Sequence, residues 1–420
     1  MTTPTPIRST EQTTPTTRSR SATAASLWLM FTICLVAVNL RPTLTSLGPL
    51  VDSVRDGLGL SGSAMGVLIT LPILCFGAFA PLAPQLLRYQ SAERIILVGL
   101  AVLVLGIGLR SLFGVVGLFA GTTLAGASIS VIMVLLPSII KQHFPRQAGQ
   151  MMGVYSTALC LGAAVAAGAT VPLENIPGSN WRWALAFWLV PAVIATIVWR
   201  LQRPASQRQT EQTRVVLPRL RTNLLAWQVT LFMGLQSALA YCVFGWLPVI
   251  LIDRGMTPLL AGLVLSVSIG VQLISSLSGP WLATRGRDQR ATIAFMLSLT
   301  LIGLMGCLYG SLSSVWLWAV LLGLGQGGTF SIALALLVLR APTAQVAASL
   351  SGMAQGVGYS IAALGPFIVG LLHEYSGNWH GVAVFFVLTA LGSFAFAMYA
   401  GQARYISLEP APANSPGQAG

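Results

Sequence analysis

The sequence predicts an all-α membrane protein of twelve transmembrane helices in two pseudo-symmetric six-helix bundles, and three observations predict this fold. Hydrophobic residues make up 55% of the chain and charged residues 8%, whereas an ordinary soluble domain is about 25% charged. Small clusters of charge separate apolar stretches that are long enough to cross a bilayer. Finally, the chain repeats itself at a spacing of 199 residues, as between Pro49 and Pro248.

The repeat is carried by proline, arginine and glycine residues rather than by common apolar residues. Further pairs at the same spacing are Arg55 with Arg254, Arg88 with Arg287, Gly126 with Gly325, Lys141 with Arg340, and Gly153 with Gly352. The phrase Gly-Ser-Asn-Trp at 178–181 returns as Ser-Gly-Asn-Trp at 376–379. A period of half the chain is too long for a solenoid. Two tandem halves in a membrane chain predict a transporter whose halves move about a site between them.

Each expected helix is an apolar run bounded by charged or turn-forming residues; Arg88, for example, lies between the second run and the third. In chain order the runs are 25–47, 62–84, 93–110, 115–140, 150–172, 182–200, 225–252, 259–283, 291–310, 315–340, 346–372 and 381–401. The expected bundles are therefore 25–200 and 225–401. Residues 1–24, rich in Thr, Ser and Pro, are expected to be a disordered tail. The arginine-rich segment 201–224 is expected to be a linker, and 402–420 a second tail.

The net charge of +13 is distributed so that it orients the chain in a membrane. If the N-terminus is cytoplasmic, the outer loops hold four basic residues and five acidic ones: Arg55, Arg110, Arg182, Arg254, Asp52, Asp56, Glu174, Asp253 and Glu374. Apart from Arg41, every other basic residue then lies inside. This positive-inside pattern predicts a multi-pass protein with both termini in the cytoplasm. The basic surplus reflects topology and contact with anionic membrane lipids, and we expect no nucleic-acid partner.

Catalytic and metal-binding motifs are missing from the sequence. The five cysteines lie inside apolar runs without metal or redox spacing, and the three histidines lie at helix ends or in loops. No carboxylate lies in the middle of a span, and there is no phosphate-binding loop or convergent Ser/His/Asp set. We therefore expect neither an enzyme nor a cofactor. An ATP-driven pump is excluded unless a partner supplies the ATPase.

Arg41 is the one charge that lies well inside an expected span rather than near its end. At 1.5 Å per residue it lies about 22 Å along the first helix, past the midplane in the outer half, and its repeat counterpart is Ala240. Intramembrane charges are costly and usually functional. One interpretation is that the guanidinium group binds an anionic group of the substrate. The other is that the side chain snorkels to the outer headgroups or bonds to carbonyls freed near Pro42.

Uncharged polar residues in the spans complete the candidate binding site. Thr45 shares a helical face with Arg41, whereas Asn39 does so only if Pro42 bends the span. The remaining candidates are Tyr155, Gln236, Tyr241, Gln272, Gln326, Gln355 and Tyr359. Gln355 and Tyr359 are one turn apart on one face. Each of these side chains has the alternative of bonding to a neighbouring helix. Together they suit a small polar or aromatic ligand better than a lipid.

Several phrases carry a resemblance to a known family. They are Asn-Leu-Arg-Pro-Thr-Leu-Thr-Ser-Leu-Gly-Pro-Leu at 39–50, Leu-Pro-Ser-Ile-Ile-Lys-Gln-His-Phe-Pro at 136–145, and the motifs within 234–248 and 353–366. The chain resembles the cyanate and nitroimidazole transporter group of the major facilitator superfamily from about residue 25 to 400. The resemblance implies the major facilitator fold, alternating access, a bacterial inner membrane and a small organic or inorganic solute. The superfamily's Gly-x-x-x-Asp-Arg-x-Gly-Arg loop lacks its acid in both copies, at 80–88 and 279–287.

The expected function is secondary active transport of a small anionic or polar aromatic solute, cyanate-like or nitroimidazole-like, by a monomer. Arg41 is the candidate anion-binding residue. One alternative is an exporter of other drug-like compounds. Exporters of cations usually need a mid-span acid, which this chain lacks. A second alternative is a non-transporting membrane scaffold subunit, which would have no need of Arg41 or of paired half-repeats.

Overall fold

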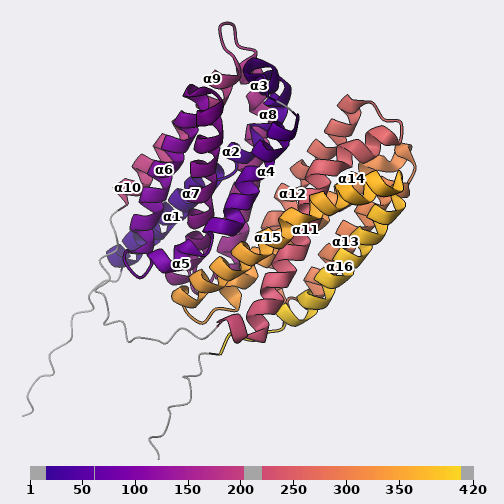
Figure 1. Ribbon diagram of the computed structural model, residues 1–420. Helices are drawn as coiled ribbons and strands as arrows, with labels where there is room; N and C mark the ends of the chain where they lie inside the picture. The colour runs from indigo at the N-terminus through magenta and orange to yellow at the C-terminus, as the bar shows by residue number, and fades with distance from the viewer. Residues whose placement is uncertain (1–15, 61, 203–219, 408–420) are drawn as a thin grey trace, which may run out of the picture.

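The computed structural model describes residues 16–60, 62–202 and 220–407, and every regular element in these ranges is a helix. The helices form two bundles that lie side by side (Figure 1). Eleven helices of the described ranges are long and apolar enough to cross a membrane. The twelfth expected span, 62–84, corresponds to the shorter helix α4 and its continuation α5. Most of the expected tails and linker, at 1–15, 203–219 and 408–420, falls outside the described residues.

The first bundle contains the spans before the linker. Its helices are α1 (Thr16–Asn39), α2 (Pro42–Thr45), α3 (Val51–Leu58), α4 (Gly62–Phe79), α5 (Leu82–Leu86), α6 (Ala92–Leu112), α7 (Gly114–His143), α8 (Ala148–Glu174), α9 (Trp181–Ala186) and α10 (Leu189–Leu201). The second bundle contains α11 (Leu224–Asp253), α12 (Pro258–Arg285), α13 (Arg290–Tyr309), α14 (Val315–Leu339), α15 (Ala344–Ser376) and α16 (His380–Ala400). Single 3₁₀ turns lie at Gly48–Leu50, Leu220–Thr222 and Leu312–Ser314.

The repeated Asn-Trp phrase marks equivalent turns in the two bundles. Asn180 caps α9 because its side chain accepts hydrogen bonds from the backbone N–H groups of Arg182 and Trp183. In the second copy, Asn378 accepts from the N–H of His380 at the start of α16. Gly377 ends α15 in the left-handed conformation with φ 62°, which glycine adopts without strain. The repeat in the sequence is therefore a repeat of local structure.

The first expected span, 25–47, is interrupted in the structure. α1 begins earlier than expected, at Thr16, and ends at Asn39. The chain then restarts as α2, with Pro42 as its first residue and Arg41 as its N-cap. Proline suits the first position of a helix, where its missing N–H is not needed, but its ring blocks continuation of the helix before it. The expectation of one unbroken helix was wrong at this proline, and α3 follows as an additional short helix.

Glycine and proline pack the two bundles together near one end of the molecule. We call this end the terminal face; α1 begins, α10 ends, α11 begins and α16 ends there (Figure 1). A Cβ atom at Gly153 of α8 would lie 3.4 Å from Cγ of Pro280 on α12. A Cβ at Gly356 of α15 would lie 3.2 Å from Cγ of Pro81, which precedes α5. Pro81 and Pro280 are separated by the repeat spacing, and Gly356 lies one turn beyond Gly352, the repeat counterpart of Gly153.

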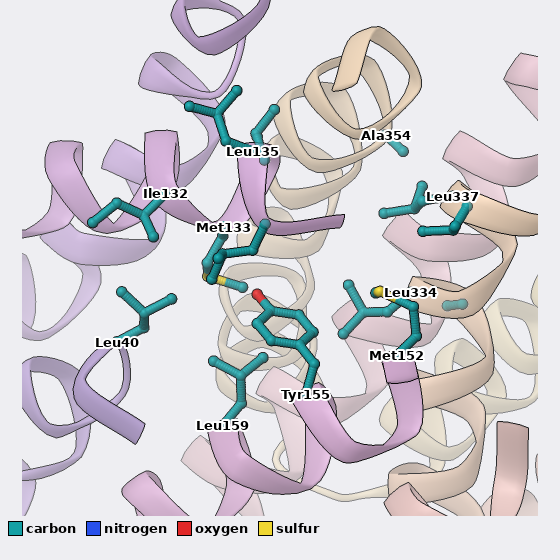
Figure 2. Close-up of a cluster of buried hydrophobic side chains, with 14 of the residues drawn as sticks. Leu40, Ile132, Met133, Leu135, Met152, Tyr155, Leu159, Leu334, Leu337 and Ala354 are labelled. Carbon is teal, nitrogen blue, oxygen red and sulfur yellow. The ribbon is translucent and has the colours of Figure 1, made fainter. Parts of the chain in front are cut away.

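The buried core is shared between the bundles on only one side. The largest cluster of buried residues draws Leu40, Met133 and Tyr155 from the first bundle and Leu334 and Ala354 from the second (Figure 2). The two smaller clusters each belong to a single bundle. One is built around α11, α13 and α16 and the other around α3, α4 and α9. The bundles therefore share a core toward the terminal face and have separate cores toward the opposite face, where α3 and α9 lie.

Side-chain exposure along α8 and α15 shows the same asymmetry. Gly153 and Gly352 are buried in the contact near the terminal face. Further along the same helices, Val165 is 48% exposed and its repeat counterpart Leu364 is 55% exposed. These two helices make the contacts between bundles, so their exposed ends mark where the bundles separate. The structure is closed at the terminal face and open toward the opposite face.

Candidate functional site

Arg41 lies where the two bundles meet, at the break in the first span. Its guanidinium group is 5.4 Å from the ring centroid of Phe330 on α14, a distance at which a cation is attracted to an aromatic face. It lies close enough to Tyr241 on α11, and to Tyr155 and Tyr359, to interact with them electrostatically. Arg41 is half-buried. The side chain is therefore held by groups of both bundles and keeps part of its surface accessible.

Two tyrosine hydroxyls beside Arg41 are buried without a hydrogen-bond partner. Tyr155 on α8 is fully buried and Tyr359 on α15 is 1% exposed, and neither hydroxyl makes a hydrogen bond. Tyr359 packs against Phe76 and Tyr241, with ring centroids 5.8 Å and 6.3 Å away. Figure 2 shows the Tyr155 hydroxyl pointing toward Met133. Most buried polar groups are paired, so an unpaired pair of hydroxyls next to a cation marks a candidate ligand position.

Asn39 and Thr45 flank Arg41 but bond to their own segment. The Asn39 amide nitrogen donates to the carbonyl of Leu35 at 2.8 Å. The Thr45 hydroxyl donates to the carbonyl of Arg41 at 3.2 Å. Both side chains thus satisfy backbone carbonyls around the helix break. Their hydrogen-bond donors are engaged locally, although both residues remain next to Arg41 in the chain.

The three glutamines Gln236, Gln272 and Gln326 gather inside the second bundle. Nε2 of Gln272 donates to Oε1 of Gln326 at 3.3 Å. Gln236 donates to the Ser237 hydroxyl at 2.8 Å and to the Met233 carbonyl at 3.2 Å, both on its own helix. Gln236 and Gln326 line a narrow void with Leu239, Leu297, Thr300 and Thr329. The contacts that the structure gives Arg41 are with aromatic side chains and Cys160 rather than with these amides.

Gln355 links the two bundles directly. Its side chain is 1% exposed, and its Nε2 atom donates to the Met133 carbonyl of α7 at 3.2 Å. One turn further along α15 is Tyr359, as the sequence spacing predicts. The predicted pairing on one face therefore places Gln355 against the first bundle beside the tyrosine that interacts with Arg41.

Phe330 and Cys160 were not among the residues predicted from the sequence. Cys160 interacts electrostatically with Arg41 and lies 3.5 Å from the Ser276 hydroxyl of the other bundle. Cys160 is the repeat counterpart of Tyr359, a signal that the repeat alignment contains. Phe330 follows Gln326 by about one turn on α14, but nothing in an apolar sequence tells which face of that helix points toward Arg41.

The arrangement combines one fixed positive charge with aromatic walls and free hydroxyl donors. A guanidinium group binds planar anions through parallel N–H donors, and aromatic faces stack on flat rings. In the described residues no three His, Cys, Asp or Glu side chains gather in a way that would hold a metal ion. The chemistry available is binding rather than bond breaking.

Comparisons with known proteins agree with this picture. Residues 27–363 match the profile of the Major Facilitator Superfamily. The uncharacterised transporter YycB of Bacillus subtilis (strain 168) is 38% identical and spans 91% of this chain and 95% of its own length. The 2-nitroimidazole transporter of Escherichia coli (strain K12) is 35% identical over 89% of this chain and 95% of its own length. The cyanate transport protein CynX of the same strain is 29% identical over 87% and 94%.

Solved structures show the same fold at low sequence identity. The proton:xylose symporter XylE superposes with a TM-score of 0.75 and 10% identity, over 92% of this chain and 98% of that one. The transporter FucP in its outward conformation gives a TM-score of 0.70 and 14% identity, over 90% of this chain and all of that one. The twelve-helix fold, the transporter class and the resemblance noted in the sequence are confirmed, and the protein is not an enzyme. This multi-pass membrane protein is a transporter that belongs to the major facilitator superfamily.

Proposed function

We propose that this protein is a secondary active transporter for a small anionic or polar aromatic solute, which binds at Arg41 between the two bundles. It acts in a bacterial inner membrane with both termini in the cytoplasm. The observation that carries the proposal is the half-buried Arg41 with two unpaired, buried tyrosine hydroxyls beside it. A ligand with a negatively charged group would accept hydrogen bonds from all three.

The aromatic side chains around Arg41 support a flat ligand. Phe330 and Tyr241 contact the guanidinium group from the second bundle, and Tyr359 packs against Tyr241. A planar ring or a linear anion fits between such faces more readily than a bulky sugar does. The names of the two Escherichia coli relatives, for 2-nitroimidazole and cyanate, fall into these two chemical classes.

The location of the site supports alternating access. Arg41 and Tyr155 belong to the first bundle, whereas Tyr241, Phe330 and Tyr359 belong to the second. A ligand that bridges the two sets interacts with both bundles at once, and rocking of one bundle against the other exposes such a site to each side in turn. With the terminal face in the cytoplasm, the structure corresponds to a state open to the outside.

The test compares Arg41→Ala with Arg41→Lys in proteoliposomes loaded with, or incubated in, radiolabelled cyanate and 2-nitroimidazole. Loss of a buried charge-assisted interaction weakens binding by about 2–5 kcal/mol, or roughly thirty-fold or more, so Arg41→Ala should abolish transport. Arg41→Lys should restore little, because an ammonium group does not reproduce the planar set of donors. Arg182→Ala is the matched control, since it removes an arginine that is half-buried like Arg41 but lies at the opposite face.

The outcomes separate the two interpretations of Arg41. Near wild-type transport by Arg41→Lys would reject recognition by the planar guanidinium group, since a snorkelling side chain tolerates lysine. Transport by Arg41→Ala would reject the anion site. An exporter of cationic drugs is disfavoured because Arg41 would repel a cation held against its aromatic neighbours.

A further inference from the structure

Arg110 is an unexpected buried charge. The charge pattern places it in an outer loop, but α6 continues to Leu112 and the side chain is only 1% exposed. The structure also explains how α6 comes so close to its neighbour at this point. A Cβ atom at Gly121 of α7 would lie 2.4 Å from the backbone nitrogen of Arg110, so only glycine allows this approach.

The guanidinium group of Arg110 is bonded to the segment that follows Arg41. Its Nη1 atom donates to the Thr43 carbonyl and its Nη2 atom to the Ser46 hydroxyl, each at 2.8 Å. Thr43 lies in α2 and Ser46 is its C-cap. Both acceptors are uncharged, so these bonds do not neutralise Arg110. A buried charge without neutralisation is costly, which points to a role other than stability alone.

α2 is a weak element by itself. It has four residues, and its own backbone bonds run from Leu44 and Thr45 to the Arg41 carbonyl and from Ser46 to the Pro42 carbonyl. A helix this short is not stable in isolation because nucleation is unfavourable. Arg41 is the N-cap of α2, so any movement of α2 moves the backbone from which the Arg41 side chain projects.

The second bundle holds a comparable arginine that has no site attached to it. Arg254, the C-cap of α11, donates from its guanidinium group to the carbonyls of Cys307 and Gly310 at the end of α13. In both bundles an arginine therefore links the outer end of the first span to the end of the third. The arginine is on the third span in one bundle and on the first span in the other. Arg254 is the matched control for Arg110.

We propose that Arg110 is a positioning residue of the Arg41 site. By holding α2 against α6, it fixes the helix break so that the Arg41 guanidinium group faces Tyr241 and Phe330. This inference rests on the proposed function for its transport consequence. The structural consequence, order in the segment 40–47, is independent of any ligand.

Hydrogen–deuterium exchange of the purified full-length protein tests the structural consequence. Wild type is compared with Arg110→Gln, Arg110→Lys, Ser46→Ala and Arg254→Gln. In Arg110→Gln, amides of residues 40–47 should exchange about tenfold faster, because two hydrogen bonds to a charged donor are lost. Arg254→Gln should leave 40–47 unchanged and instead speed exchange near Cys307 and Gly310. Exchange of 40–47 within about threefold of wild type in Arg110→Gln would overturn the proposal.

Two further variants keep the test decisive if Arg110→Gln does not fold. Ser46→Ala removes one acceptor and leaves the charge in place, so exchange of 40–47 should rise by a few-fold; no rise would also count against the proposal. Arg110→Lys supplies a single donor group and should give an intermediate rate. If the exchange rate of 40–47 equals that of wild type in both variants, the two hydrogen bonds from Arg110 to Thr43 and Ser46 do not hold α2 in place, and the proposal is rejected.

The transport arm uses 2-nitroimidazole and cyanate as probes in proteoliposomes. Arg110→Gln should raise the half-saturating concentration about tenfold while Arg254→Gln leaves it unchanged. If wild type transports neither probe, the proposed function fails for these solutes, but the exchange result still decides the role of Arg110. If wild type transports a probe and Arg110→Gln does so with unchanged half-saturation, the positioning role fails alone.

Discussion

At the scale of single residues, the candidate site depends on which polar atoms lack partners. The hydroxyls of Tyr155 and Tyr359 are buried and unpaired, whereas the amides of Asn39 and Gln236 donate to carbonyls of their own helices. An unpaired donor costs stability and is available to a ligand. A donor that is already bonded gains little by binding one. The hydroxyls are therefore better candidates for ligand contact than the amides.

Removal of either hydroxyl should separate binding from stability. In Tyr155→Phe and Tyr359→Phe, the melting temperature should stay the same or rise, because no hydrogen bond is lost in the free protein. The affinity for a transported anion should fall by about threefold to tenfold, the cost of one hydrogen bond. Thermal unfolding and equilibrium binding measure the two quantities. The control is Tyr399→Phe, an exposed tyrosine on α16; a loss of stability in the site variants without a change in affinity would show that the hydroxyls only pack.

Part of this site is visible in the sequence, and the rest depends on packing. Arg41 is identifiable as a charge inside an apolar span, and Tyr359 by its spacing from Gln355. Arg110 is not, because a charge near the end of a span usually snorkels to the headgroups. It turns inward here because Thr43 and Ser46 offer acceptors at the helix break. Whether an amide such as Gln236 bonds to its own helix or across to another depends on side-chain orientation, which apolar periodicity does not specify.

At the scale of elements, the contact between the bundles depends on glycine residues, which have no side chain to keep the helices apart. A Cβ atom at Gly352 of α15 would lie 2.7 Å from Cγ of Pro84 on α5, and one at Gly149 of α8 would lie 2.8 Å from Cγ2 of Thr284 on α12. Both distances are shorter than real carbon contacts. The spans were recognisable from hydrophobicity, and Pro42 was recognisable as a possible bend. The sequence did not show which of the many glycines face the other bundle.

A methyl group at this contact should open the terminal face. Gly352→Ala introduces overpacking that costs about 1–3 kcal/mol, and only the closed arrangement contains the clash. The equilibrium should therefore shift toward the state that is open at the terminal face by roughly five-fold to 150-fold. Spin labels at Arg88→Cys and Arg287→Cys, in a cysteine-free background, report the distance between bundles, which should lengthen.

The matched control for this element is another alanine substitution in a transmembrane helix. Gly270→Ala in α12 adds the same methyl group where the structure has open space around the Cβ position. It should leave the label distance unchanged. Equal distances in Gly352→Ala and wild type would mean that α5 and α15 separate or slide without cost, and that the glycine contact does not hold the terminal face closed.

At the scale of the whole molecule, the orientation in the membrane remains a prediction from charge. The structure places the start of α1, the start of α11 and the end of α16 at one end of the bundles (Figure 1). The positive-inside pattern assigns that end to the cytoplasm. The division of the spans into two halves was predicted correctly from hydrophobicity and the repeat. Of the twelve expected spans, eleven appear in the described residues as helices long enough to cross a membrane, and the twelfth corresponds to the shorter α4 with α5. Which end of the molecule is open and which is closed was not predicted, because hydrophobicity and charge do not specify how the two bundles lean against each other.

Reporter fusions test the orientation. Fusions after Arg221 and after Arg404 should be active with a reporter that folds only in the cytoplasm and inactive with one that requires export. Both points lie at the terminal face, so they should behave alike. Activity of the exported reporter at either point would invert the orientation, and a different result at the two points would change the number of spans in the second bundle.

The contact of Gly153, Gly356 and Gly352 with proline rings has a consequence for how such a transporter responds to its surroundings. Apposed backbone and pyrrolidine carry no net charge, so bringing them together or apart releases no counterions and moves no protons. Ionic strength and pH act on exposed charges, so they should have little effect on this glycine–proline contact. The contribution of this contact to the proposed balance between inward and outward states therefore depends on shape rather than on charge. A single methyl group at one of these glycines is therefore expected to shift that balance without changing any residue of the candidate binding site.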